Sequence, residues 1–228
     1  MSREEELAKL MKDWHDAIGK ENYFNPDGIV DPASWDEQDA GKKVLFVLKE
    51  TNELKGDSEK DPKSVSLVEH LMKPSAPSKY GSMWPRIAEW WHAIYYNNDA
   101  YHWYETQEAQ KILKNVAVMN LKKTPGSAQA KEDDVVQHIK DHWERIQQEI
   151  DLIDPDIIVF CGTWWMIQQA HQEYKNAISE LRFAKMTFPP NSGKTRLLIE
   201  YWHPAARYPT IVMYYGIQGI YRVSRAEN

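Results

Sequence analysis

Cysteine is almost absent from this chain of 228 residues, in which Cys161 stands alone. One thiol excludes an internal disulfide, and it excludes any four-cysteine zinc or iron–sulfur site built within the chain. His138 and His142 have the spacing of a metal-binding helix pair, but no H-E-x-x-H pattern accompanies them. We therefore expect a packing role for Cys161, a solvated helix face for the two histidines, and no metal or other cofactor.

Long apolar segments are missing as well. No run approaches the roughly 18 residues that span a bilayer. The N-terminus has no apolar core for a secretory signal, and its three consecutive glutamates argue against a transit peptide. The content of 42% hydrophobic and 12% aromatic residues is too apolar for disorder. We expect one soluble globular domain over residues 1–228, a cytoplasmic location and no membrane partner.

Positive charge is in deficit, since 34 acidic residues against 28 lysines and arginines give a net charge of −6. Such a chain has no global attraction for nucleic acid, because the sequence-independent part of that affinity comes from cations that neutralise phosphates. Binding to nucleic acid would have to depend on a local basic lining around one site.

Four segments have the length and continuous apolar character of strands buried on both faces. Helical patterns precede and separate them, and this alternation predicts right-handed crossovers and a three-layer α/β/α domain around a mainly parallel, four-stranded sheet. The predicted strands are residues 42–50, 116–121, 156–162 and 196–202. The predicted helices are residues 3–18, 66–73, 82–97, 105–115, 131–153, 163–175 and 209–225, and residues 53–64 are expected to form a surface loop.

Three polar segments follow predicted strands at the edge where parallel α/β sheets bind their ligands. They are "LKETNE" after the first strand, "NLKKTPG" after the second and "WHPAARYP" after the last. Asn120, at the end of a buried strand, carries an amide donor and a carbonyl acceptor that either the fold or a ligand must satisfy. We therefore expect the functional site at this edge.

These segments resemble, in content and in order, the motifs of the uracil-DNA glycosylase superfamily. "VLFVLKETN" stands where that family has a first motif such as G-Q-D-P-Y or G-I-N-P-G, and "NLKKTPGSA" is similar to its N-x-x-K-x-x-P-P-G-like segment. "IDPDIIVFCG" resembles the family's helix–proline–strand stretch, and "YWHPAARY" resembles its H-P-S motif. The resemblance covers residues 42–216 and implies the α/β/α fold of that family, with residues 1–40 as an N-terminal elaboration.

The resemblance implies a DNA glycosylase of the base-excision-repair type, which hydrolyses the N-glycosidic bond of uracil or a related damaged base in DNA and requires no cofactor. Glu50 would orient or activate water and stabilise the developing sugar cation. His203 would donate a hydrogen bond to the base oxygen as negative charge builds there. Asn120 would read the edge of a base that has been flipped out of the stack.

Further contacts follow from the same resemblance. Tyr80, in "KYGSMW", would stack on the base, and Asn52 would belong to the substrate-binding set. Independently of the resemblance, basic residues near the motifs would give this acidic protein a local basic rim that contacts phosphates. The expected partner is DNA that contains uracil or another damaged base. These basic residues are Lys49, Lys122, Lys123 and Arg207.

The chain also departs from the family pattern. Leu48 and Thr51 stand where the first motif has its glycine and proline, and Ala205 replaces the serine of the last motif. Together with the acidic charge, these changes suit a second hypothesis, a catalytically inactive member of the fold that binds nucleic acid, a nucleotide or a protein partner. A third alternative is a hydrolase that acts on free nucleosides or nucleotides.

Overall fold

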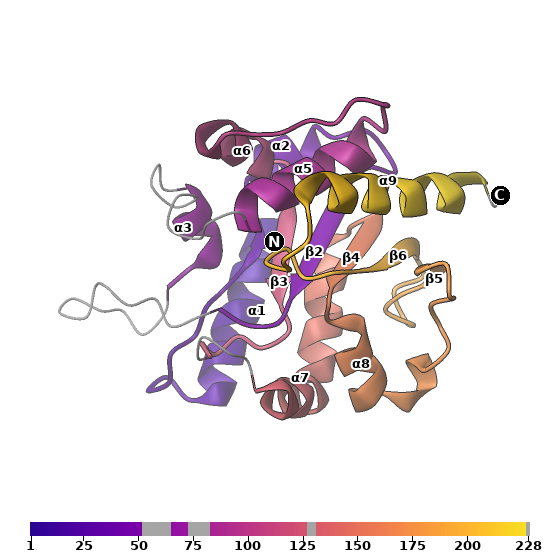
Figure 1. The fold of residues 1–228 in the computed structure, drawn as a ribbon. Coiled ribbons are helices and arrows are strands. Elements are labelled where there is room, and N and C mark those ends of the chain that lie inside the picture. Colours follow the sequence, from indigo (N-terminus) through magenta and orange to yellow (C-terminus); the bar gives the residue numbers. More distant parts are fainter. Residues whose placement is uncertain (52–64, 73–82, 127–130, 227–228) are drawn as a thin grey trace.

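The computed structural model describes residues 1–51, 65–72, 83–126 and 131–226, and within these ranges it shows an α/β fold (Figure 1). The strands of this described part form one mixed sheet. They are β1 (Gly28–Ile29), β2 (Val44–Leu48), β3 (Ala117–Asn120), β4 (Ile157–Cys161), β5 (Phe183–Thr187) and β6 (Thr195–Tyr201). Their order across the sheet is β1-β3-β2-β4-β6-β5.

The four predicted strands are confirmed as β3, β2, β4 and β6, which lie in the centre of the sheet and run parallel to one another. The predicted number of strands, four, was too small, because the described residues add an antiparallel strand at each edge of the sheet. β1 has two residues, too short for any periodicity, and β5 is only partly buried, so it lacks the continuous apolar run of the central strands.

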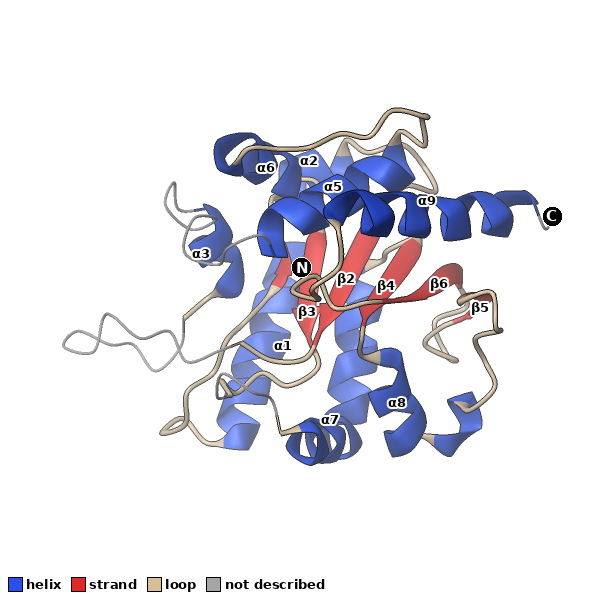
Figure 2. Ribbon diagram, viewed as in Figure 1, coloured by secondary structure: helices blue, strands red, loops and turns tan. Residues whose placement is uncertain are grey.

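The helices cover both faces of the sheet (Figure 2). Those that the structure describes occur where the apolar spacing predicts them, except the short α2, which begins at Pro32 and is capped by the Asp31 carboxylate. They are α1 (Arg3–Ile18), α2 (Pro32–Asp36), α3 (Leu67–Met72), α5 (Met83–Tyr95), α6 (Thr106–Leu113), α7 (Glu132–Ile153), α8 (Trp164–Ala170) and α9 (Thr210–Ala226), with a 3-10 turn η1 (Gln172–Tyr174) after α8.

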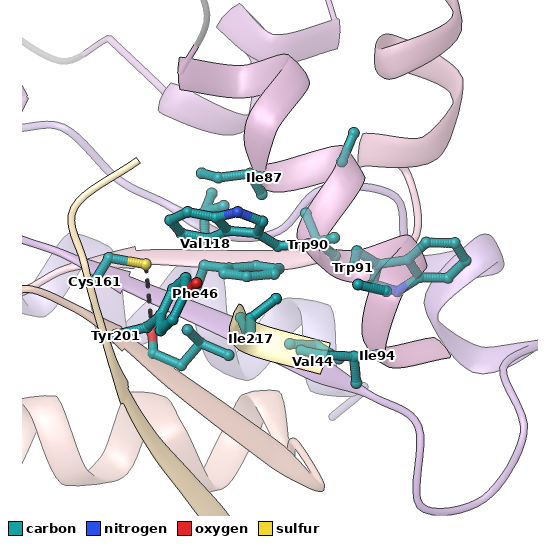
Figure 3. Packing of buried hydrophobic residues seen from close by; sticks show 14 of the residues in the cluster. Val44, Phe46, Ile87, Trp90, Trp91, Ile94, Val118, Cys161, Tyr201 and Ile217 are labelled. Atoms are coloured by element: carbon teal, nitrogen blue, oxygen red, sulfur yellow. Dashed lines mark hydrogen bonds between the residues drawn. The ribbon is translucent and has the colours of Figure 1, made fainter. Parts of the chain in front are cut away.

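One core layer lies between the sheet and the helices α5 and α9. Alternate residues of β2, such as Val44 and Phe46, face this layer, and Figure 3 shows the indole of Trp90 next to the ring of Phe46. Both aromatic side chains are fully buried, and truncation of such a residue costs about 3–5 kcal/mol. Cys161 is buried in the same layer, which confirms its packing role, and burial raises the pKa of its thiol.

A second core layer lies between the opposite face of the sheet and the helices α1, α7 and α8. Leu45 and Val47, the remaining central residues of β2, face it. α1 contributes a stripe that includes the fully buried Trp14, and its first turn is closed by reciprocal hydrogen bonds between Ser2 and Glu5. Among the described residues no helix is both long and apolar enough to cross a membrane.

Candidate functional site

The predicted polar segments lie along one edge of the sheet. The chain after β3 continues beside the chain after β2, since the Leu121 N–H donates to the Leu48 carbonyl at 3.0 Å and the Lys122 N–H donates to the Lys49 carbonyl at 2.9 Å. The chain after β6 turns next to the end of β4, where a side chain on Gly162 would lie 3.4 Å from the His203 backbone nitrogen. The carboxyl ends of the parallel strands therefore bring all three segments to the same edge.

Asn120 ends β3 with only 1% of its surface exposed. Its backbone N–H donates to Asp27 Oδ2 at 2.6 Å, so the fold satisfies the main chain. Its side-chain Nδ2 is buried and has no hydrogen-bond partner in the part of the chain that the structure describes. An unsatisfied buried donor costs about 1–3 kcal/mol, and this cost is relieved when a ligand supplies the acceptor.

Glu50 and Lys122 join the first two segments. Lys122 Nζ lies 2.5 Å from Glu50 Oε2, and the two side chains are 15% and 3% exposed. The Glu50 carboxylate occupies the space next to Gly126, where an added Cβ would lie 1.7 Å from Oε1. A side chain at position 126 would therefore displace the Glu50 carboxylate, and the Gly126 N–H donates to the Thr51 carbonyl at 2.8 Å.

His203 is held as a neutral imidazole. Burial, assisted by the charge of Lys49, lowers its pKa to about 4. Its Nδ1 accepts a hydrogen bond from the Ala205 N–H at 3.2 Å, which places the proton of the neutral ring on Nε2. His203 therefore offers an Nε2–H donor at neutral pH. Lys49 itself pairs with Glu132 in the first turn of α7 at 3.0 Å.

Arg86 of α5 fixes the loop that carries His203. Its guanidinium is buried, and Nη1 donates to the carbonyls of Pro204 at 2.5 Å and Ala206 at 2.8 Å. Arg86 is not among the residues predicted from the sequence. The available signal was a single cation within the apolar helix "MWPRIAEWW", where an arginine must find buried acceptors.

Lys123 does not lie on a basic rim, so its predicted phosphate contact is wrong. Its side chain is fully buried and pairs with the equally buried carboxylates of Asp27 and Glu149, the latter at 2.7 Å. The ammonium also lies 5.1 Å from the ring centre of Trp14. Although burial alone would lower the pKa of Lys123, the two carboxylates raise it above the ordinary value. Lys123 is thus a structural cation beneath the site.

The solvated helix face expected for His138 and His142 is wrong as well. Both rings pack against Trp14, at centroid distances of 6.0 and 5.7 Å. Burial, with the neighbouring His142, lowers the pKa of His138 to about 3. No group of three or more side chains suited to a metal ion occurs among the described residues.

Of the remaining predicted residues, two are at least partly exposed and two lie outside the described part of the chain. Arg207 is exposed, and the Lys49 side chain is 23% exposed. Asn52 and Tyr80, together with the surface loop expected at residues 53–64, lie outside the described residues.

Two hollows lined by described residues lie away from the carboxyl edge. One is at the amino ends of the central strands, beside Gly41 and Arg225, and the other lies between α1 and α7. Neither involves the residues that the sequence singled out.

Comparison with protein-family models and with curated proteins gives no match to this chain. The site is therefore interpreted from its own chemistry. At one edge of a parallel sheet it offers a buried amide, a carboxylate paired with a lysine, and a neutral imidazole with its proton on Nε2.

Proposed function

We propose that this protein is a DNA glycosylase with a uracil-DNA glycosylase-like fold, which hydrolyses the N-glycosidic bond of uracil or a related damaged base in DNA. The observation that carries the proposal is the Asn120 amide, buried at the end of a core strand, whose NH₂ group has no partner within the described residues. An amide matches the edge of uracil, which presents a carbonyl acceptor beside an N–H donor.

His203 suits the departing base. Negative charge accumulates on a pyrimidine oxygen as the glycosidic bond breaks, and a donor placed in advance stabilises that charge. With a pKa of about 4, His203 donates its Nε2–H as a neutral group and does not transfer a proton to the base. Arg86 supports this role because it holds the two carbonyls that follow His203 in the loop.

Glu50 is suited to stabilise the sugar in the transition state. A carboxylate near the anomeric carbon stabilises the developing oxocarbenium ion and orients the attacking water. Lys122 fixes the orientation of this carboxylate through their ion pair. Lys49 and the exposed Arg207 are the cations nearest in sequence to Glu50 and His203, and they would contact the DNA phosphates.

One observation favours a second candidate function. The Glu50 side chain is only 3% exposed, and one of its oxygens is already engaged by Lys122. If Glu50 stays this deeply buried when a ligand binds, water does not reach its second oxygen and the carboxylate cannot act on it. The protein would then be a catalytically inactive relative of the same fold that binds nucleic acid, a nucleotide or a protein partner.

The test is base release from oligonucleotides that carry one uracil, single- or double-stranded, followed by alkaline cleavage and gel separation. We expect abasic product from the wild-type protein, loss of product with Asn120→Ala and Glu50→Gln, and no change with Asn98→Ala, an exposed control. If stoichiometric enzyme yields no abasic product from any of several damaged bases, catalysis is refuted. Saturable binding that Glu50→Gln leaves unchanged would then support the second candidate.

A further inference from the structure

Aromatic rings form a continuous row from the core to the surface beside His203. Trp90 of α5 meets Tyr201, the last residue of β6, edge to face at 5.0 Å (Figure 3). Tyr201 meets Trp202 at 5.1 Å, and Trp202 meets Tyr208 at 4.9 Å with the ring planes 32° apart. Exposure rises along the row, from 0% at Trp90 and 6% at Tyr201 to 41% at Trp202 and 50% at Tyr208. The outer end of the row is open to solvent.

The chain that carries the exposed rings is anchored to neighbouring elements. The Tyr201 hydroxyl donates to the Met213 carbonyl of α9 at 2.5 Å. Arg86 holds the loop between the two exposed rings through the carbonyls of Pro204 and Ala206. Isolated surface aromatics are common and require no explanation. A pair of rings that contact each other on an anchored loop differs from these, because a ligand that stacks on it loses less affinity to ordering the side chains.

Cationic and apolar groups surround the open end. Arg207, directly before Tyr208, is exposed. The first turns of α9 add Ile211 and Val212, which are 48% and 52% exposed. A protein with a net charge of −6 therefore presents, in one loop, a cation next to two adjoining aromatic rings. This combination matches a polyanion whose monomers have flat aromatic faces.

We propose that Trp202 and Tyr208 form a stacking platform for unpaired bases of a single-stranded DNA segment, at the same edge of the sheet as the base that is held at Asn120. The inference rests on the proposed function, since it takes the ligand at Asn120 to be a base of DNA. Arg207 contacts a phosphate of the same segment. In a duplex the faces of the bases are covered by their neighbours, so the open end of the ring row selects a strand whose bases are unpaired.

The experiment is fluorescence anisotropy with a labelled, uracil-free single strand of thymidines at low salt. We expect Tyr208→Ala to weaken binding about fivefold to 150-fold, the range for loss of one stacking ring. Tyr208→Phe keeps the ring and retains most of the affinity. The matched control is Tyr96→Ala, which removes a tyrosine of similar exposure, 54%, at the far end of α5. It leaves binding unchanged.

A second measurement tests the phosphate contact and the strand preference. Arg207→Ala should weaken binding and lower the dependence of log K on log salt by about 0.7, the value for one phosphate contact on a single strand. A hairpin duplex that contains the same thymidine tract should bind more weakly than the single strand. The melting temperature of each variant is measured first. Only variants as stable as the wild-type protein are compared, so that weaker binding reflects loss of stacking and not loss of the fold.

The outcomes separate this inference from the proposed function. The DNA contains no uracil and binding requires no turnover, so a failure of base excision leaves the test intact. Equal binding by Tyr208→Ala and Tyr96→Ala, equal binding of duplex and single strand, or no binding by the wild-type protein each overturns the platform. If uracil excision is observed together with any of these results, the stacking platform is refuted and the glycosylase proposal is not.

Discussion

Lys122 and Lys123 are neighbours in the sequence and have opposite surroundings in the structure. Lys122 is 15% exposed and pairs with Glu50 at the candidate site, whereas Lys123 is fully buried and pairs with Asp27 and Glu149. The chain after β3 directs the two side chains to different places, since Lys122 reaches Glu50 at the edge of the sheet and Lys123 reaches Asp27 in the core. The same side chain therefore has a site role at one position and a structural role at the next.

The buried cluster of Asp27, Lys123 and Glu149 supports the site from below. Asp27 uses one carboxylate oxygen for Lys123 Nζ and the other for the backbone N–H of Asn120. Any change in this cluster should therefore act first on stability and reach the site through Asn120. A change in the pair of Glu50 and Lys122 should act first on the site.

The largest effect is expected from Lys123→Met. The substitution leaves two carboxylates buried without their cation, which typically costs about 3–5 kcal/mol of the free energy of unfolding. Urea denaturation measures this loss. Lys122→Met is the matched control, because it removes an identical side chain one residue away.

The triple variant with Lys123→Met, Asp27→Asn and Glu149→Gln sharpens this comparison. It removes all three buried charges and should recover most of the stability, because an uncharged cluster has no unpaired ion to bury. If Lys123→Met is no less stable than Lys122→Met, the buried cluster does not have the structural role that we assign to it.

A smaller effect is expected from Glu149→Gln, and it depends on pH. Burial, together with the negative charge of Asp27, raises the pKa of Glu149 well above 4.5, while Lys123 opposes this shift. Because the pKa of Glu149 is higher in the folded state than in the unfolded state, its protonated form contributes to the free energy of unfolding. This contribution is fully present below about pH 4.5 and is lost as the pH rises through the folded-state pKa. Glutamine does not ionise, so the variant should lose less stability than the wild-type protein over that rise in pH. Parallel pH-dependent denaturation curves for the two proteins would contradict the shift.

The sequence predicts much of this arrangement, and the limits have physical causes. Continuous apolar runs identify the four central strands, and parallel strands place Glu50, Asn120 and His203 at one edge. The burial of Lys123 was not predictable, because its partner Asp27 lies 96 positions away in a loop with no periodic pattern. Arg86 was missed for the same reason, since its partners are carbonyls more than a hundred residues further along the chain.

Lys122→Met should have a modest effect on stability and a larger one on the site. Removal of one hydrogen bond to a charged group costs about 1.5–3 kcal/mol. Glu50 also loses the partner that fixes its orientation, so base excision measured in single turnovers should slow more than substrate binding weakens. Lys122→Arg keeps the charge and should restore part of the rate. A stability loss as large as that of Lys123→Met would remove the distinction between the two lysines.

The smallest effect is expected at Lys49, the third lysine of this edge. Its positive charge helps to lower the pKa of His203, but burial of the imidazole lowers that pKa more. Lys49→Met should therefore raise the pKa of His203 while leaving it below 6.5, and Lys140→Met, an exposed lysine of α7, should leave it unchanged. Imidazole nitrogen NMR measures the pKa and shows whether the proton is on Nε2.

Because the folded-state pKa of His203 is depressed, protonation of His203 should cost stability as the pH falls from 6.5 towards 4. A wild-type pKa near 6.5 would mean a hydrated, partly charged ring, which is not the neutral donor that the proposed reaction requires.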